Sequence, residues 1–434
     1  MYQKNDELTV TIEDQGINGE GIGKVNGYAL FVKNAITGDK CRVIITKVGK
    51  TFGYGKVLEI INASKDRVEP ICDNAGRCGG CQLMEMSYEA QLKFKEKKVR
   101  DNLERIGKVS FANVEFLPII GMDNNLRYRN KTQYPVGKNK ANDVIYGFYA
   151  GRTHSIIETK DCYLAPEINK EIMDIIIGFM NDYNIRPYDE KTGKGLIRHI
   201  LIRNSKLEEI LVCIIANGNE IKDAEELIDR LNKIRNITSI CLNVNKKKDN
   251  VILGDKTITL FGKDSIKDSI GDMIFRISPK SFFQINFQQT KKLYDVAVAF
   301  ADIKKEDIVW DMYCGIGTMT LRFADEAKWV YGVEIVPEAI VDARKNAKDN
   351  NIKNVTFYCG AAEDVVPKVY NDENNVEINN PDVVVVDPPR KGCDEVLLDT
   401  IVKMNPNKIV YVSCDSATLA RDVKILNEKG YEIK

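Results

Sequence analysis

The chain has 434 residues, which is enough for two to four domains with separate cores. It carries 63 basic and 63 acidic residues, so net charge gives no sign of a nucleic-acid partner and does not exclude RNA. No apolar run reaches the roughly 18 residues of a membrane span, and the N-terminus lacks an apolar signal region, so we expect a cytosolic protein without a membrane partner. Eleven cysteines without a secretion signal favour reduced thiols with metal-binding or catalytic roles.

Residues 1–60 have the pattern of a small β-barrel, because short runs of alternating polar and apolar residues are separated by glycines. The glycine cluster at 18–27 looks like a dinucleotide-binding loop. It leads into an expected strand, Tyr28–Val32, and not into a helix, which argues against that function. Small five-stranded barrels often bind oligonucleotides, although a role as a spacer has similar support.

Three cysteines follow on a glycine-rich loop, Cys72, Cys78 and Cys81, with the spacing C-x5-C-x2-C. Three thiols this close can surround a metal centre. Cys162 is the natural fourth ligand, since it follows a compact intervening segment and is flanked by turn residues. Four thiolates suit an iron–sulfur cluster or structural zinc, and the spacing alone leaves both open beside ordinary buried cysteines.

The central region combines basic segments with an α+β pattern. A predicted amphipathic helix, Tyr88–Ile106, carries lysines and Arg100 largely off its apolar face. The segment Asn125–Lys131 adds three cations around Tyr128, a mixture that suits phosphate contacts and stacking on unpaired bases. Strands and helices then alternate over residues 140–265. We therefore expect an RNA-facing side here.

The C-terminal region begins a doubly wound sheet. The apolar run Ile308–Trp310 precedes a glycine turn that includes Tyr313, and a helix follows. The second strand of this region ends in Glu334, where an acid can accept hydrogen bonds from ribose hydroxyls. The glycine turn is shorter than a full dinucleotide motif, which favours S-adenosylmethionine over a dinucleotide.

Two further strands place an acid and a thiol at one crevice. The runs Val383–Val386 and Ile409–Val412 are too short and too β-branched for helices, and a helical pattern lies between them. Asp387 follows the first run, and Cys414 follows the second. Ligands bind at the carboxyl ends of the strands in an open α/β sheet, so we expect both side chains to face one site.

In these motifs the chain resembles the cytosolic RNA (uracil-5-)-methyltransferases of the bacterial 23S rRNA type, which make 5-methyluridine. The resemblance rests on motifs that occur in the family's usual order. They are GEGIGKVNGYALFV, the cysteines at 72, 78 and 81, Cys162, SFFQIN, DMYCGIGT, GVE, DPPRKG and YVSCDSATLARD. It implies a multidomain α/β protein: a TRAM-like barrel at 1–60, a central α+β domain at 61–274 and a doubly wound, Rossmann-like methyltransferase domain at 275–434.

The resemblance also implies roles for single residues and for partners. Cys414 would be the nucleophile, and the substrate would be single-stranded or loop uridines of 23S rRNA, with no obligate protein partner. It favours a [4Fe-4S] cluster over zinc. The implied contacts to S-adenosylmethionine are Gln284, Tyr313, Glu334 and Asp387, and the implied cluster ligands are Cys72, Cys78, Cys81 and Cys162.

Three rival interpretations remain beside this one. RNA 5-methylcytosine enzymes also use a thiol after the fifth strand, but they carry a second cysteine directly after the fourth-strand proline, where this chain has Pro389-Arg390. Amino-group methylation prefers an aromatic residue at the position of Arg390. The third interpretation is an iron–sulfur RNA-binding module with impaired catalysis.

The last four residues, Tyr431–Lys434, look like the opening of a sixth strand. In the family that the chain resembles, a proton-abstracting glutamate lies in a histidine-containing motif beyond this point. The only histidines are His154 and His199. We therefore expect a truncated form with weak turnover and an unpaired edge at Ile409–Val412 that favours self-association.

Overall fold

The computed structural model describes residues 2–370 and 381–434. The chain divides into two compact units. Unit 1 comprises Met1–Lys97, Asn125–Arg127 and Tyr134–Ile200, and unit 2 comprises Lys98–Asn124, Tyr128–Gln133 and Leu201–Lys434. Within the described ranges, no helix combines the length and the apolar composition that crossing a membrane requires.

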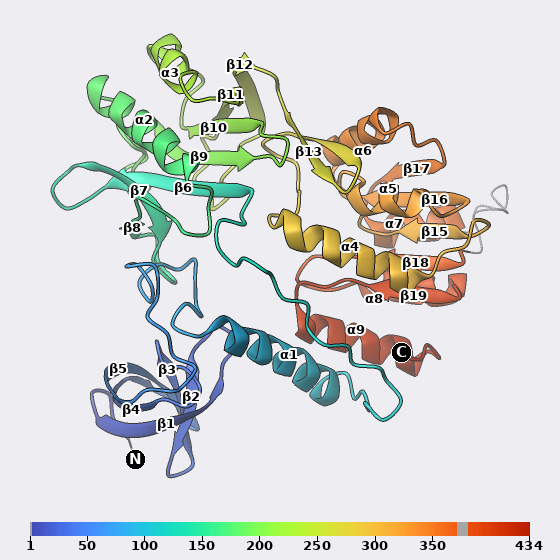
Figure 1. The fold of residues 1–434 in the computed structure, drawn as a ribbon, viewed down its shortest axis with the longest axis horizontal. Helices are drawn as coiled ribbons and strands as arrows, with labels where there is room; N and C mark the ends of the chain where they lie inside the picture. The colour runs from blue at the N-terminus through green and yellow to red at the C-terminus, as the bar shows by residue number, and fades with distance from the viewer. Residues whose placement is uncertain (1, 371–380) are drawn as a thin grey trace. The chain divides into compact units, whose positions relative to one another are not determined.

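Unit 1 begins with a closed five-stranded barrel, as predicted (Figure 1). Its strand order is β1-β2-β3-β5-β4, and the side chains of Leu30, Val32 and Cys41 are fully buried inside it. The glycine cluster supplies β2 and the tight turn into β3, so it shapes the barrel. The strands are β1 (Glu7–Gln15), β2 (Gly21–Val25), β3 (Tyr28–Lys33), β4 (Lys40–Val48) and β5 (Phe52–Asn62).

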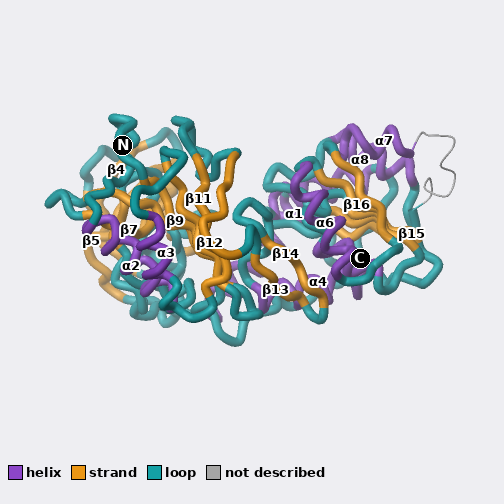
Figure 2. Tube along the Cα trace, turned by 90° about the horizontal axis from the view of Figure 1, so that it is seen from above, coloured by secondary structure: helices purple, strands orange, loops and turns teal. Residues whose placement is uncertain are grey.

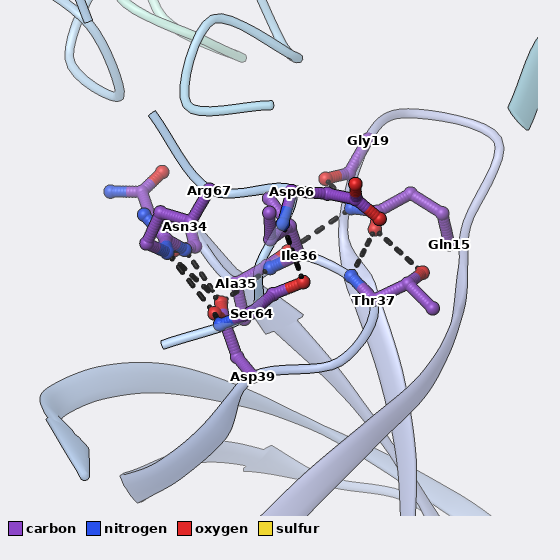
Figure 3. A network of polar contacts seen from close by, with 10 residues as sticks. All are labelled: Gln15, Gly19, Asn34, Ala35, Ile36, Thr37, Asp39, Ser64, Asp66 and Arg67. Carbon is purple, nitrogen blue, oxygen red and sulfur yellow. Dashed lines mark hydrogen bonds and ion pairs between the residues drawn. The ribbon is translucent and has the colours of Figure 1, made fainter. Parts of the chain in front are cut away.

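A buried ion pair joins the barrel to the chain that leaves it (Figure 3). The Asp39 carboxylate is fully buried and lies 2.6 Å from Nη2 of Arg67. Backbone amides of Ile36 and Ser64 donate to the same carboxylate at 2.8 and 2.9 Å. Burial alone would raise the pKa of Asp39, but these hydrogen bonds and the charge of Arg67 hold it below its ordinary value.

A seven-stranded sheet follows, with the order β12-β11-β10-β9-β6-β7-β8. Its central strands β9 and β10 are buried along nearly their whole length. The elements of this region are α1 (Tyr88–Arg105), β6 (Lys131–Lys138), β7 (Val144–Tyr149), β8 (Ile156–Glu158), α2 (Ile168–Asp182), β9 (Ile197–Asn204), β10 (Ile210–Ala216), α3 (Ala224–Leu231), β11 (Ile237–Val244) and β12 (Lys256–Gly262).

Unit 2 contains the doubly wound sheet that the sequence predicts. Five parallel strands have the order β17-β16-β15-β18-β19, and a hairpin of β13 and β14 precedes them. The elements are β13 (Ile266–Ile270), β14 (Met273–Ile277), α4 (Phe287–Ala301), β15 (Ile308–Asp311), α5 (Thr318–Ala324), β16 (Trp329–Glu334), α6 (Pro337–Asp349), β17 (Val355–Cys359), α7 (Ala362–Tyr370), β18 (Val383–Val386), α8 (Glu395–Met404), β19 (Lys408–Tyr411) and α9 (Ser416–Glu428).

Helices cover both faces of this sheet (Figures 1 and 2). Alternate residues of β18 point to opposite faces: Val383 and Val385 pack in the cluster with α4, α5 and α6, whereas Val384 and Val386 pack in the cluster with α7, α8 and α9. This two-sided burial explains the continuous valine run and confirms the reading of a parallel sheet.

One local prediction is wrong, and two elements were not predicted. The first of these elements is helix α7, which contains Pro367, an unfavourable residue inside a helix. The β13–β14 hairpin was also missed. Tyr431–Lys434 do not form a strand; the amide of Tyr431 closes the end of α9 on Leu426 O at 3.0 Å, and its hydroxyl donates to Pro406 O at 3.1 Å. The strand β19 is the last in the sheet order among the described residues, as expected of an edge.

Candidate active site and cysteine cluster

Four neighbouring parallel strands of unit 2 lead to polar residues at one edge, among them the predicted site residues Glu334, Asp387 and Cys414. Asp311 ends β15 and Glu334 ends β16, whereas Asp387 directly follows β18. Directly after β19, the amide of Val412 donates to Val386 O at 2.8 Å, so β18 and the segment that follows β19 stay paired up to the residue before Asp387. The carboxyl ends of parallel strands share one edge, so the structure brings these acids and the Cys414 segment to the same side of the sheet.

The glycine turn after β15 and the Glu334 carboxylate hold each other. The amide of Gly315 donates to one carboxylate oxygen at 3.1 Å, and the amide of Val336 donates to the other at 2.9 Å. Gly315 and Gly317 have φ angles of +54° and +84°, which favour glycine. A Cβ at Gly317 would also lie 3.3 Å from the Phe357 ring. The turn therefore packs closely against the sheet and fixes the Glu334 carboxylate beside it.

Two acids at this edge, Asp311 and Asp387, have raised pKa values. Burial raises the pKa of Asp311 to about 7, with the charges of Asp387 and Glu334 adding to the shift, although Thr320 Oγ1 donates to its carboxylate at 2.7 Å. Burial also raises the pKa of Asp387 to about 6. Because the charge of Asp387 raises the pKa of Asp311, these two carboxyl groups lie close together. A cationic ligand near them would favour their ionised forms.

Different residues of unit 2 contact Gln284 and Tyr313. The backbone of the loop that carries Gln284 is held by Asn130, whose side-chain amide donates to Gln284 O at 2.9 Å and whose backbone amide donates to Ile285 O at 2.9 Å. Burial raises the pKa of Tyr313, and its hydroxyl lies at hydrogen-bonding distance from the Cys393 thiol. Asn130 belongs to the basic segment that we assigned to RNA, but its hydrogen bonds serve the site.

Cys414 is exposed, which argues against the view that it is merely a buried thiol. Hydrogen bonds fix the backbone on both sides of it. Ser413 Oγ donates to Asp415 O at 2.9 Å and accepts from Asp415 N at 3.0 Å. The Asp415 carboxylate caps α9 by accepting from Ala417 N at 2.9 Å. The thiol therefore stands on a hydrogen-bonded turn at the same edge of the sheet as Asp387.

A buried carboxylate that sequence reasoning missed connects the loops around this site. Asp422, in α9, has no exposed surface and accepts hydrogen bonds from Cys393 N at 2.8 Å and from the Tyr411 hydroxyl at 2.6 Å. Arg421 pairs with it at 2.6 Å and also donates to Lys391 O at 2.9 Å. The only signal in the sequence is an Arg-Asp pair in a helix, which usually lies on the surface.

The four predicted metal-ligating cysteines all lie in unit 1, and each is partly exposed. Burial, followed by the charges of Cys162 and Cys72, raises the pKa of Cys78, so these three thiols interact. Cys81 lines a pocket beside Cys78. Within residues 2–370 and 381–434, no group of three or more ligating side chains has the geometry of a metal site. The donor set nevertheless has the soft chemistry that suits iron–sulfur clusters and zinc.

Arg127 holds the segment with Cys162. Its guanidinium donates to both carboxylate oxygens of Asp161 at 2.7 Å, and Nη1 also donates to Cys162 O at 2.9 Å and Ala165 O at 3.0 Å. We expected Arg127 to contact phosphate, so this role is different. Two cations of α1 also have partners within the chain: Lys97 pairs with Asp14 at 3.0 Å, and Arg100 lies 4.4 Å from two phenylalanine rings.

Comparisons with known proteins agree on the family. Residues 87–432 match the family described as tRNA (Uracil-5-)-methyltransferase, and residues 3–58 match the TRAM domain. An uncharacterized RNA methyltransferase of Halalkalibacterium halodurans is 48% identical over 99% of this chain and 93% of its own length. A second, from Clostridium tetani, is 46% identical over 99% and 92%.

A solved structure is similar over nearly the whole chain. It is the tRNA (uracil-54, C5)-methyltransferase of Pyrococcus abyssi in complex with S-adenosyl-L-homocysteine. The TM-score is 0.74 and the sequences are 26% identical, over 96% of this chain and 93% of that one. The similarity therefore covers the barrel, the central region and the parallel sheet.

Proposed function

Since the chain belongs to the S-adenosylmethionine-dependent RNA (uracil-5-)-methyltransferase family, we propose that it makes 5-methyluridine in 23S rRNA through a covalent bond between Cys414 and uracil. One observation carries the mechanism: an exposed thiol on a rigid turn stands at the same sheet edge as Asp387. In this proposal Gln284, Tyr313, Glu334 and Asp387 hold the cofactor. The carboxylates suit its positive charge and its ribose hydroxyls.

The chemistry requires a nucleophile because C5 of uracil is itself a weak one. The Cys414 thiolate adds to C6, and the electron pair of the C5–C6 double bond moves into an enolate that is nucleophilic at C5. S-adenosylmethionine would supply the methyl group: C5 forms a bond to the methyl carbon as the sulfur–methyl bond breaks, and the electron pair of that bond stays on sulfur, which leaves as a neutral thioether. A general base then removes the C5 proton, and the returning electron pair expels Cys414 as thiolate. The uridine must leave any base stack for Sγ to reach C6.

RNA that contains 5-fluorouridine tests the nucleophile, because fluorine cannot leave as the proton does and the adduct is trapped. We expect the full chain with S-adenosylmethionine to form a complex that survives denaturing electrophoresis, and Cys414→Ala to form none. Cys359→Ala is the matched control, since Cys359 is another exposed thiol of unit 2. An adduct in Cys414→Ala would refute the assignment.

The choice of RNA needs a separate test. The ordered motifs favour 23S rRNA, whereas the matched family and the Pyrococcus abyssi protein are named for tRNA. We expect 5-methyluridine to disappear from 23S rRNA, and to stay in tRNA, when the gene is deleted. Loss from tRNA alone would overturn the rRNA proposal and leave the uracil chemistry intact.

We also propose that Cys72, Cys78, Cys81 and Cys162 hold a [4Fe-4S] cluster with a structural or RNA-positioning role. The number and the softness of the thiol donors support it, together with the interaction of Cys78 with Cys162 and Cys72. Protein purified without oxygen should be brown and contain about four iron and four sulfide per chain. Colourless protein with one equivalent of zinc would contradict the proposal.

A further inference from the structure

The C-terminal half of α1 packs against α9 within unit 2 (Figure 1). Leu103 of α1, Ala420 of α9 and Val109 in the segment after α1 form a buried apolar cluster. Gly107 follows the end of α1, and a Cβ there would lie 3.2 Å from Ala420 O, so the chain approaches the α9 backbone closely. The end of α1 therefore has a defined place on α9.

One hydrogen bond joins α1 to the first residue of α9. The side-chain amide of Asn102 donates from Nδ2 to Ser416 Oγ at 2.8 Å, across 314 residues of sequence. Asn102 is the neighbour of Leu103 on α1, and Ser416 lies one helical turn before Ala420 on α9. The hydrogen bond therefore extends the apolar contact to the start of α9, directly beyond the Cys414 turn.

The segment after α1 braces the helix around Asn102. The Arg100 guanidinium lies 4.4 Å from the ring centroids of Phe111 and Phe116, and these two rings meet edge to face at 5.1 Å. The amide of Ile106 donates to Asn102 O at 2.9 Å. These contacts fix the backbone from which the Asn102 side chain extends.

Hydrogen bonds within the Cys414 turn fix its shape, but they do not fix where it stands relative to the sheet. Ser413 and Asp415 hydrogen-bond each other in the turn, and Asp415 caps α9. The placement of the turn depends on contacts from outside it. Asp422 provides such contacts to the loop after β18 and to β19, and Asn102 provides one from α1 at the residue where α9 begins.

We propose that Asn102 is a positioning residue for methyl transfer. Its hydrogen bond to Ser416 holds the start of α9 where the Cys414 thiol can reach C6 of the uracil ring. The proposal rests on the proposed function, in which Cys414 is the nucleophile. Bond formation at C6 requires the sulfur at the correct distance and angle, and a displacement of about 1 Å can cost about 100-fold in rate. Asn102 acts through the turn and not on the reacting atoms.

Asn102→Leu tests this role, because leucine has a similar volume and favours a helix but cannot donate to Ser416. The probes are 23S rRNA and tRNA, each transcribed with 5-fluorouridine, with the full chain and S-adenosylmethionine. We expect the rate of adduct formation at saturating RNA to fall about tenfold, with the dissociation constant of the RNA unchanged. Glu104→Leu is the matched control and should keep the wild-type rate, since Glu104 is exposed in the same turn of α1.

Two further measurements separate positioning from stability. Ser416→Ala removes the acceptor of the same hydrogen bond, so it should lower the saturating rate by a similar factor. The double variant should lose no more than either single variant, because both remove one interaction. Alkylation of Cys414 by iodoacetamide, followed by mass spectrometry of its peptide, requires only an exposed thiol and should keep its wild-type rate in each variant.

Several results would overturn the proposal. Asn102→Leu that melts at a lower temperature but keeps the saturating rate would show a purely structural contact. Losses that multiply in the double variant would show that the two side chains act separately. Alkylation that slows as much as adduct formation would show that the thiol loses exposure and not orientation. A wild-type chain that forms no adduct with either RNA would overturn the covalent mechanism and the positioning role together.

Discussion

Removing the Asp422 carboxylate should uncouple the two loops of the candidate active site. This side chain accepts hydrogen bonds from Cys393 N, in the loop after β18, and from the Tyr411 hydroxyl, at the end of β19. It also neutralises Arg421, which holds the carbonyl groups of the same loop. The first loop begins at Asp387 and the second leads to Cys414, so we expect this one buried group in α9 to influence the spacing of the proposed acid and nucleophile.

The size of the effect follows from the donors that Asp422→Ala leaves behind. A buried donor without an acceptor costs about 1–3 kcal/mol, so the Cys393 amide and the Tyr411 hydroxyl together cost about 2–6 kcal/mol, whereas Arg421, whose side chain is 46% exposed, can turn to solvent. At about 2–4 °C per kcal/mol for a large domain, the melting temperature of unit 2 should fall by roughly 10 °C. Below that temperature the rate of adduct formation should still fall, since Cys414 and Asp387 lose their fixed spacing.

Thermal unfolding and the 5-fluorouridine adduct assay measure these two effects. Tyr411→Phe removes a single donor and should cost only about 1 kcal/mol. Glu428→Gln is the control, because Glu428 is an exposed carboxylate in the same helix whose partner, Lys424, is also exposed. If Asp422→Ala melts within about 2 °C of the wild type and forms the adduct at the same rate, the buried network does not position the site.

Three other substitutions test the remaining supports. Asp39→Asn should destabilise the barrel by about 3–5 kcal/mol at neutral pH. Folding lowers the pKa of Asp39 below 3.8, so the wild-type ion pair contributes stability above that pH and loses it as the pH falls through the folded-state pKa. The free energy of unfolding, measured with denaturant, should therefore differ less between pH 7 and pH 3 in the variant than in the wild type. Asp161→Asn loosens the segment with Cys162, so iron content and visible absorbance should decay faster than in the wild type. Gly392→Ala should lower the melting temperature, because φ is +78° and a Cβ would lie 2.5 Å from Arg421 Nη2.

The parallel sheet could be predicted because its signal is local. The run Val383–Val386 is too short for a helix and apolar on both faces, and such a segment fits only between two layers of helices. Parallel strands have their carboxyl ends at one edge of the sheet, so Glu334 and Asp387, which lie at the ends of two such strands, were expected at one site. The same reasoning did not predict helix α7. This helix contains Pro367, which is unfavourable in a helix, but the packing of Val366 in the core outweighs that cost.

The supports of the site could not be predicted, because burial of a polar side chain depends on contacts that are distant in sequence. Asp422 meets Cys393 across 29 residues, and Asn130 meets Gln284 across 154. Arg127 looked like a phosphate ligand for the same reason: its carboxylate partner lies 34 residues away. Composition identifies a charged residue, but only the folded chain determines whether its charge is already neutralised.

The acids at the sheet edge explain how the site would distinguish a cofactor from its product. Burial raises the pKa of Asp311 to about 7, with the charges of Asp387 and Glu334 adding to the shift, and burial alone raises the pKa of Asp387 to about 6, so holding negative charge at this edge is unfavourable. A ligand with positive charge reverses that repulsion and favours the ionised carboxyl groups, at about 1.4 kcal/mol for each unit by which a pKa falls. S-adenosylmethionine carries a sulfonium, whereas S-adenosylhomocysteine has a neutral thioether of nearly the same shape. If the proposed contacts to these acids are made, loss of that charge on methyl transfer weakens the attraction, and we expect S-adenosylhomocysteine to bind less tightly than S-adenosylmethionine, a difference that calorimetry on the full chain would measure.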